Sequence, residues 1–161
     1  MNRVLPAAFF VWCHDSAISE WINDSMWGFA IIETLHILAL TVLLGTIIAM
    51  DLRLLGVRSG RQTTAELANE LAPFTLSALV LLIATGVPMF MSQAIRYSQS
   101  WSFFVKMTLL VFAVAFHFTV YRNVTMGGVK ERPRFGRLAA SLSLICWLGV
   151  ALAGRGIAFL P

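Results

Sequence analysis

Four apolar stretches dominate the chain, at residues 26–50, 71–92, 102–121 and 138–158. Each stretch approaches or exceeds the roughly 20 residues that cross about 30 Å of hydrocarbon as a helix. Polar residues, glycines and prolines separate the four stretches. The pattern predicts an all-α integral membrane protein, folded as an antiparallel four-helix transmembrane bundle.

The composition supports the same class of protein. Of the 161 residues, 58 % are hydrophobic and 12 % are charged, whereas a soluble domain has about 45–50 % apolar and about 25 % charged residues. We therefore expect an outer N-terminal segment at 1–25 and a four-span membrane domain at 26–161. In the segment, Ile18, Trp21 and Ile22 share one helical face, which predicts a short helix lying on the membrane surface.

The positive charges lie mainly in two of the loops and predict the orientation. Eight of the twelve Lys and Arg residues flank the second and fourth spans, whereas the other connecting regions hold mainly Arg3 and Arg96. The positive-inside rule places both basic loops in the cytoplasm and both termini on the outer side. The net charge of +4 is thereby explained by topology, and no nucleic-acid partner is expected. The eight residues are Arg53, Arg58, Arg61, Arg122, Lys130, Arg132, Arg134 and Arg137.

Ionisable residues inside the predicted spans are the candidate functional residues. An ionisable side chain at membrane depth is costly, so it usually faces the protein interior, has a partner and marks function. Glu33 and His36 are three residues apart, which places both on one face of a helix. Lys106 and Arg155 belong to the outer halves of the third and fourth spans. All four side chains are therefore expected in the outer half of the bundle.

A histidine accompanied by two cations suggests a b-type haem used for electron transfer. His36 would be the axial ligand, and Lys106 and Arg155 would be counter-charges for the propionates. His117, the other histidine in a span, is the candidate second ligand. Its depth differs from that of His36 by about 7 Å measured from the outer helix ends and by about 15 Å from the inner ends. A structural role for His117 in the core therefore stays open.

Two other functions remain open. The chain could bind or transport copper or another small solute, using Glu33 and His36 together with Met89 and Met91, whose thioethers suit Cu(I). Alternatively, the chain could be a non-catalytic accessory subunit, in which pairs made by Glu33 with Arg155 and by Asp51 only secure helix packing. No P-loop, C-x-x-C or H-E-x-x-H motif occurs, and an internal disulfide between Cys13 and Cys146 is not expected. Whether the protein is an enzyme is left open by these patterns.

The expected partners follow from the same class. The lipid bilayer surrounds the four spans, and small residues such as Gly149 and Ala153 allow helices to approach closely. We therefore expect a homo-oligomer or a subunit of a larger membrane complex.

The motif E-x-x-H at Glu33–His36, followed by Asp51-Leu52-Arg53-Leu54-Leu55-Gly56, resembles an uncharacterised bacterial family of small four-span inner-membrane proteins. That family is distantly similar to the CopD-type copper-resistance membrane domain. Thr85-Gly86, Lys106 and Gly154-Arg155 match the same pattern. The resemblance implies a multi-pass protein of the bacterial inner membrane. It also implies that asparagine commonly occupies the position of His117, which argues against a family-wide ligand there.

Overall fold

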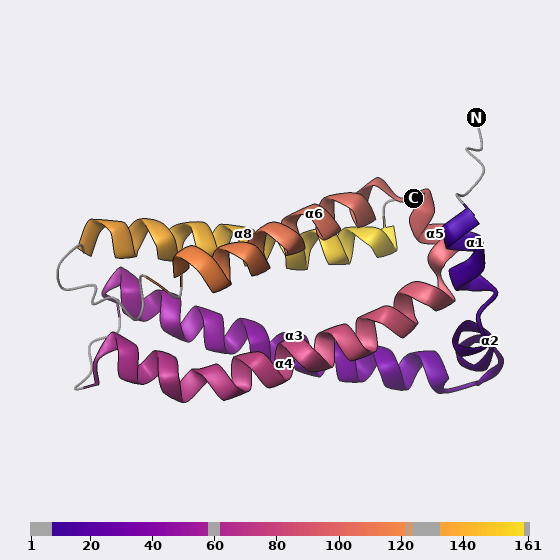
Figure 1. The fold of residues 1–161 in the computed structure, drawn as a ribbon, viewed down its shortest axis with the longest axis horizontal. Helices are drawn as coiled ribbons and strands as arrows, with labels where there is room; N and C mark the ends of the chain where they lie inside the picture. The colour runs from indigo at the N-terminus through magenta and orange to yellow at the C-terminus, as the bar shows by residue number, and fades with distance from the viewer. Residues whose placement is uncertain (1–7, 58–61, 122, 124–132, 160–161) are drawn as a thin grey trace.

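The computed structural model describes residues 8–57, 62–121, 123 and 133–159. Within these residues every element is a helix, and four helices are long and apolar enough to cross a membrane (Figure 1). They are α3 (Gly28–Leu55), α4 (Thr64–Ser92), α6 (Trp101–Phe116) together with the helical residues that follow it as far as Thr119, and α8 (Pro133–Phe159). A π-helix, η1 (His117–Tyr121), continues α6. The expected class, an all-helical protein with four candidate spans, is confirmed.

Local hydrogen bonds set the ends of α3 and α4. Helix α3 ends at Gly56, whose φ of 81° is left-handed and suits a residue without Cβ. The Gly56 and Val57 amides donate to the carbonyls of Arg53 and Leu52, which is a Schellman motif. Helix α4 begins after Thr63, which forms a capping box with Glu66. This cap places the start of α4 two turns before the apolar stretch at 71–92, and the residues of these two turns are mostly polar.

The four long helices form two antiparallel pairs that meet in a shared core. Helix α3 packs against α4 and α8, and α6 packs against α8 (Figure 1). All four contribute to one apolar cluster near their middles, which buries the apolar area that holds the pairs together. The chain reverses so that α1 and the C-terminal end of α8 lie at the same end of the bundle. The cluster comprises Leu43, Ile47, Ala78, Ala113, Cys146, Trp147 and Val150.

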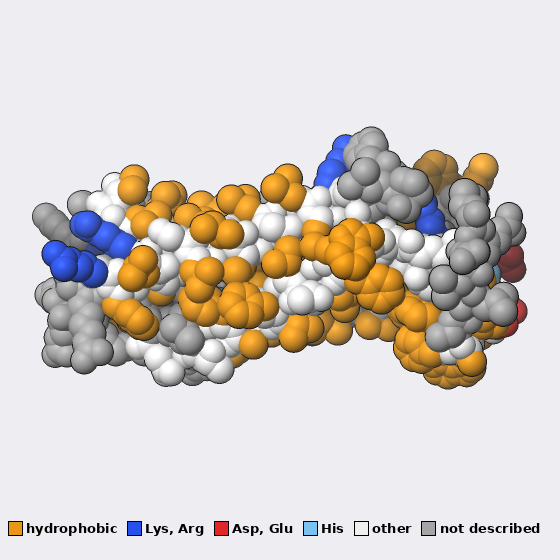
Figure 2. Space-filling view, turned by 90° about the horizontal axis from the view of Figure 1, so that it is seen from above, with side chains coloured by type: hydrophobic (Ala, Val, Ile, Leu, Met, Phe, Trp, Pro, Cys, Tyr) orange, Lys and Arg blue, Asp and Glu red, His pale blue; other side chains and the backbone are white. Residues whose placement is uncertain are grey.

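Large apolar side chains cover the outward faces of the long helices. Figure 2 shows them along most of the molecule, with Asp and Glu at one end, and with Lys and Arg at the other end and also in places near the Asp and Glu end. A monomeric soluble protein does not expose so much contiguous apolar surface. Such a surface suits helices that are long and apolar enough to cross a membrane. Examples are Ile31, Ile37, Leu38, Val80, Ile83, Val111, Leu138, Ile145 and Leu152.

The N-terminal segment differs from the expected single surface helix. It contains two helices, α1 (Ala8–His14) and α2 (Ala17–Asp24), and they pack on α5 (Ala94–Ser98) and α4 respectively. Ile18 and Trp21 are exposed, as a helix at the membrane surface requires, but Ile22 is 1 % exposed. Ile22 therefore packs against the bundle, a tertiary contact that helical periodicity alone does not reveal.

Several residues of the predicted basic loops lie outside the described residues. They are Arg58, Arg61, Arg122, Lys130 and Arg132. The described basic residues Arg53, Arg134 and Arg137 all lie at the ends of α3 and α8 that face these loops.

The capping box at the start of α4 predicts a local effect of mutation. Thr63→Ala removes the hydroxyl that accepts from the Glu66 amide at 3.2 Å, and loss of such a cap costs about 1 kcal/mol of stability. We expect faster amide hydrogen exchange in the first turn of α4, measured by mass spectrometry in detergent. Thr64→Ala, one residue further on, is the matched control and should leave that exchange unchanged. Equal effects of the two substitutions would contradict the capping role.

Candidate functional site

The imidazole of His36, a residue of α3, is positioned by a hydrogen bond to the neighbouring helix α4. Its Nδ1 lies 2.8 Å from Oγ1 of Thr85, a side chain that is 5 % exposed. The Thr85 hydroxyl also donates to the Leu81 carbonyl oxygen at 2.7 Å. A hydroxyl carries one hydrogen, so toward His36 it acts as the acceptor. Nδ1 is then the protonated nitrogen, and Nε2 keeps its lone pair.

Gly86 lets the imidazole of His36 lie against the backbone of α4. A Cβ added at Gly86 would be 3.3 Å from Cε1 of His36 and 3.8 Å from Nδ1. That separation is tighter than ordinary van der Waals contact, so a side chain here would press on the ring. Thr85 and Gly86 together determine where the ring lies and which nitrogen is available.

Lys106 reaches the same region from the second helix pair. Its half-buried side chain lies along α8, where a Cβ added at Gly154 would be 3.6 Å from Nζ. Lys106 is close enough to His36 for its positive charge to act on the imidazole. Two of the predicted site residues, from α3 and α6, are therefore brought into electrostatic range of each other.

Glu33 and Arg155 lie at the same end of the bundle but toward its surface. Both side chains are exposed. Glu33 is one turn before His36, and its charge acts on Tyr97 of α5. Arg155 directly follows Gly154 in α8, so it lies beside the backbone that Lys106 crosses. Glu33 thus belongs to the rim of the site, whereas His36 and Lys106 form its interior.

His117 lies deeper along the bundle than His36. It is the first residue of η1 and packs edge-to-face on Phe118, with ring centroids 5.4 Å apart. His117 lies 16 residues after the start of α6 at Trp101, whereas His36 lies 8 residues after the start of α3 at Gly28. The difference in depth along the bundle is about 12 Å. The π-helix itself is a feature often found at functional sites, but the sequence pattern gave no sign of it.

The residues considered for copper belong to α3 and to the end of α4. Met89 and Met91 are half-buried near the end of α4. Among the described residues no group of three or more His, Cys, Asp and Glu could hold a metal ion.

The fold and this site define a class, namely a helical protein with four candidate spans and a histidine–lysine pair between them. The chain belongs to a family of unknown function, DUF6644, whose model matches residues 8–160. No curated protein and no solved structure matches it. The expectation of an uncharacterised family is confirmed at that level, and the CopD-type likeness rests on the sequence motifs alone.

The charges around Tyr97 predict how the pKa of its phenol responds to mutation. This response tests the position of Glu33 at the rim of the site. Burial raises the pKa of the Tyr97 phenol, the Arg96 guanidinium lowers it, and the Glu33 carboxylate raises it further. Removing the negative charge with Glu33→Gln makes the phenolate easier to form, so the pKa of Tyr97 should fall. Arg96→Gln should have the opposite effect. Phenolate absorbance measured against pH in a Tyr121→Phe background reports Tyr97 alone.

Glu70→Gln is the matched control for this titration, because Glu70 is an exposed carboxylate near the start of α4, at the far end of the bundle. It should leave the pKa of Tyr97 unchanged. A Tyr97 titration unaffected by Glu33→Gln would show that Glu33 does not face Tyr97.

Proposed function

We propose that this chain is a four-span protein that binds a b-type haem through His36 and takes part in electron transfer. The observation that carries the proposal is the hydrogen bond between His36 and Thr85. Histidines that ligate a metal usually donate the other ring N–H to a protein acceptor, which orients the ring and selects the tautomer. His36 has this arrangement, because Nδ1 donates to a Thr85 oxygen whose own proton goes to Leu81.

The side chains near His36 suit a haem group. Nε2 of His36 has no hydrogen bond to another described residue, so its lone pair can coordinate iron. Lys106 and Arg155 would supply positive charge for two carboxylates, and the half-buried Lys106 is a costly residue to keep inside a membrane without such a role. A bound haem would supply a one-electron couple to the protein. The chain's own residues orient the imidazole and balance the charge.

His117 has weaker support as a second ligand. Bis-histidine ligation needs two imidazoles at similar depth on opposite sides of one iron. The offset of about 12 Å along the bundle makes that difficult, so the proposal requires His36 and leaves His117 to be tested by mutation.

Copper has less support than haem in this structure. Copper sites need several donors around one ion, and the described residues offer no such group of His, Cys, Asp and Glu. A packing role alone for His36 is also less well supported, because it does not account for a lysine from the other helix pair whose charge acts on the imidazole.

The proposal includes location and partners. The exposed apolar faces support insertion in a bilayer, and the sequence resemblance implies the bacterial inner membrane. Self-association stays a prediction. It is supported by Gly45 on the outward face of α3, where a Cβ would meet nothing within 4 Å, because such positions let a second helix approach closely.

The haem proposal is tested by an absorption spectrum of the purified protein, oxidised and then reduced, with haem supplied during expression. We expect a Soret band and sharper α and β bands after reduction. His36→Ala should abolish these bands. Thr85→Val should lower the haem content several-fold, because removing the acceptor of the Nδ1 hydrogen bond typically costs 10- to 100-fold in affinity at such sites.

Thr34→Val is the matched control, because Thr34 is exposed on α3 and its hydroxyl donates only to the Ala30 carbonyl oxygen. It should retain the full spectrum. His117→Ala distinguishes ligation by both histidines from ligation by His36 alone. A protein without these absorption bands but with stoichiometric copper would show that the bound group is copper and not haem. A protein with neither haem nor copper would support the accessory role.

The orientation is tested separately with single cysteines. We propose that both termini are outside, so Asp24→Cys, at the end of α2, should react with an impermeant maleimide added to intact cells. Gln62→Cys, in the segment between α3 and α4, should react only after the membrane is opened. Both substitutions are made in a Cys13→Ser, Cys146→Ser background, since these two cysteines are free and buried. The reverse labelling pattern would invert the proposed topology.

A further inference from the structure

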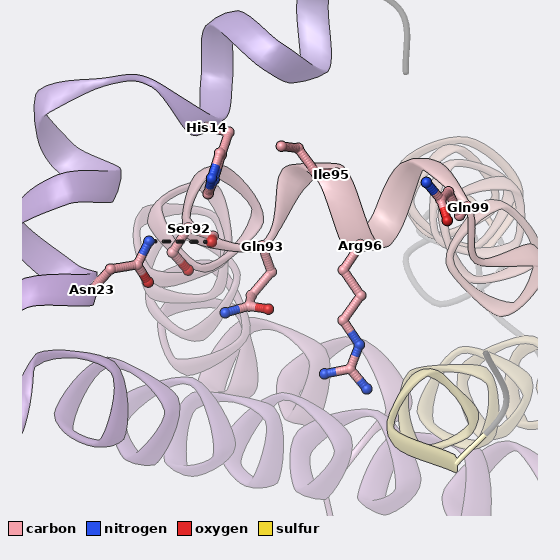
Figure 3. A pocket seen from close by; sticks show the side chains of 7 residues that line it. All are labelled: His14, Asn23, Ser92, Gln93, Ile95, Arg96 and Gln99. Carbon is pink, nitrogen blue, oxygen red and sulfur yellow. Dashed lines mark hydrogen bonds between the residues drawn. The ribbon is translucent and has the colours of Figure 1, made fainter. Parts of the chain in front are cut away.

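A cavity of about 430 Å³ lies at the end of the bundle, where α1 and α2 fold against the junction of α4 and α5 (Figure 3). Its volume is within the range of small-molecule sites. It lies apart from the candidate haem site, because Ser92 follows Thr85 by two helical turns, or about 10 Å. Its walls are His14, Asn23, Ser92, Gln93, Ile95, Arg96 and Gln99.

Tertiary contacts hold the walls of this cavity in place. Asn23 donates from Nδ2 to the Ser92 carbonyl oxygen at 3.5 Å, which joins α2 to the end of α4. Ile22 is 1 % exposed and Ala94 is completely buried. Phe10 of α1 packs edge-to-face on Phe90 of α4, with centroids 5.9 Å apart. The cavity is therefore formed by packed helices on all these sides.

The lining is rich in hydrogen-bond donors and carries positive charge. Arg96 contributes a guanidinium, Gln93 and Gln99 contribute carboxamides, and no Asp or Glu is among the lining residues. In Figure 3 the Gln93 and Arg96 side chains extend to the same side of the chain. Among the described residues, neither side chain has a hydrogen-bond partner. A guanidinium with adjacent amide donors matches the oxygens of a phosphate group.

His14 contributes a further polar atom to the cavity wall. Its side chain descends from α1 beside Ser92 (Figure 3), and its Nδ1 is buried without a hydrogen-bond partner in the described part of the chain. A buried polar atom left without a partner costs about 1–3 kcal/mol. In Figure 3 this imidazole and the Arg96 guanidinium lie on opposite sides of the α4–α5 backbone, so His14 adds to the polarity of the cavity wall and is not a ligand of the group at Arg96.

The surrounding surface places the cavity at headgroup depth. Trp12, Trp21, Trp27 and Trp101 are each more than 60 % exposed, and all belong to the helix ends at this side of the bundle. Exposed tryptophans concentrate where the hydrocarbon meets the headgroups. Phosphate groups of lipids are abundant at that depth, and soluble phosphate compounds reach it from the water.

We propose that this cavity binds a phosphate group, with Arg96 as the principal ligand and Gln93, which extends to the same side, as a hydrogen-bonding residue. The group is carried either by an anionic lipid headgroup or by a soluble phosphate compound. The proposal does not depend on haem, because it uses none of the residues of the His36 site.

The experiment uses the full chain in a neutral detergent. In the first arm, calorimetric titration with sodium phosphate is compared with sodium sulfate and sodium chloride at equal ionic strength. In the second arm, native mass spectrometry compares the retention of phosphatidylglycerol with that of phosphatidylcholine. Arg96→Gln should weaken phosphate binding or lipid retention at least tenfold. Gln93→Ala is a second variant that should weaken it less.

Arg134→Gln is the matched control, because Arg134 is an exposed arginine at the opposite end of the bundle. Phosphate binding that Arg96→Gln removes and Arg134→Gln leaves unchanged supports a soluble ligand. Selective retention of phosphatidylglycerol with the same dependence supports a lipid headgroup. Binding in neither arm, or equal effects of Arg96→Gln and Arg134→Gln, would overturn the proposal. His36→Ala should leave both arms unchanged, so failure of the haem proposal is distinguishable.

Discussion

The packing of α3 against both α4 and α8 is the interaction on which the rest of the structure depends. Hydrocarbon solvates apolar side chains as well as a protein core does, so helices within it associate through close packing and polar contacts. Leu43 and Ile47 of α3 supply the packing in the shared core. Thr46 adds a polar contact, because the Thr75 hydroxyl donates to its oxygen at 3.0 Å. A second polar contact, between His36 and Thr85, joins α3 and α4 further toward the other end.

This arrangement explains why the candidate site lies between the two helix pairs. Each pair contains a glycine at which one backbone meets a polar side chain, Gly86 beneath His36 and Gly154 beneath Lys106. The glycines allow the two polar side chains to remain close to helix backbone while the apolar faces of the same helices turn outward. A charged and a titratable group can then be kept inside the bundle, where either would be costly in contact with lipid.

The N-terminal helices α1 and α2 also pack closely against the long helices, at the end of the bundle. Ile22 and Cys13 bury apolar surface against α4 and α5, and the aromatic side chains around Phe90 hold α1 in place. The segment therefore covers the helix ends instead of only lying on the membrane. It creates a polar cavity at that end of the bundle, with Arg96 in its wall.

The sequence by itself determined the class of fold, because apolar stretches of about 20 residues have few other stable conformations in hydrocarbon. It also singled out His36 and Lys106 as candidates, since ionisable residues stand out in an apolar context, and the family resemblance pointed to Thr85-Gly86. Only the tertiary structure decided which side chains lie near one another: Thr85 hydrogen-bonds to His36, the charge of Glu33 acts on Tyr97, and His14 and Arg96 line one cavity. Those pairings join residues far apart in the chain. They depend on how helices rotate and cross in packing, which periodicity along one helix does not specify.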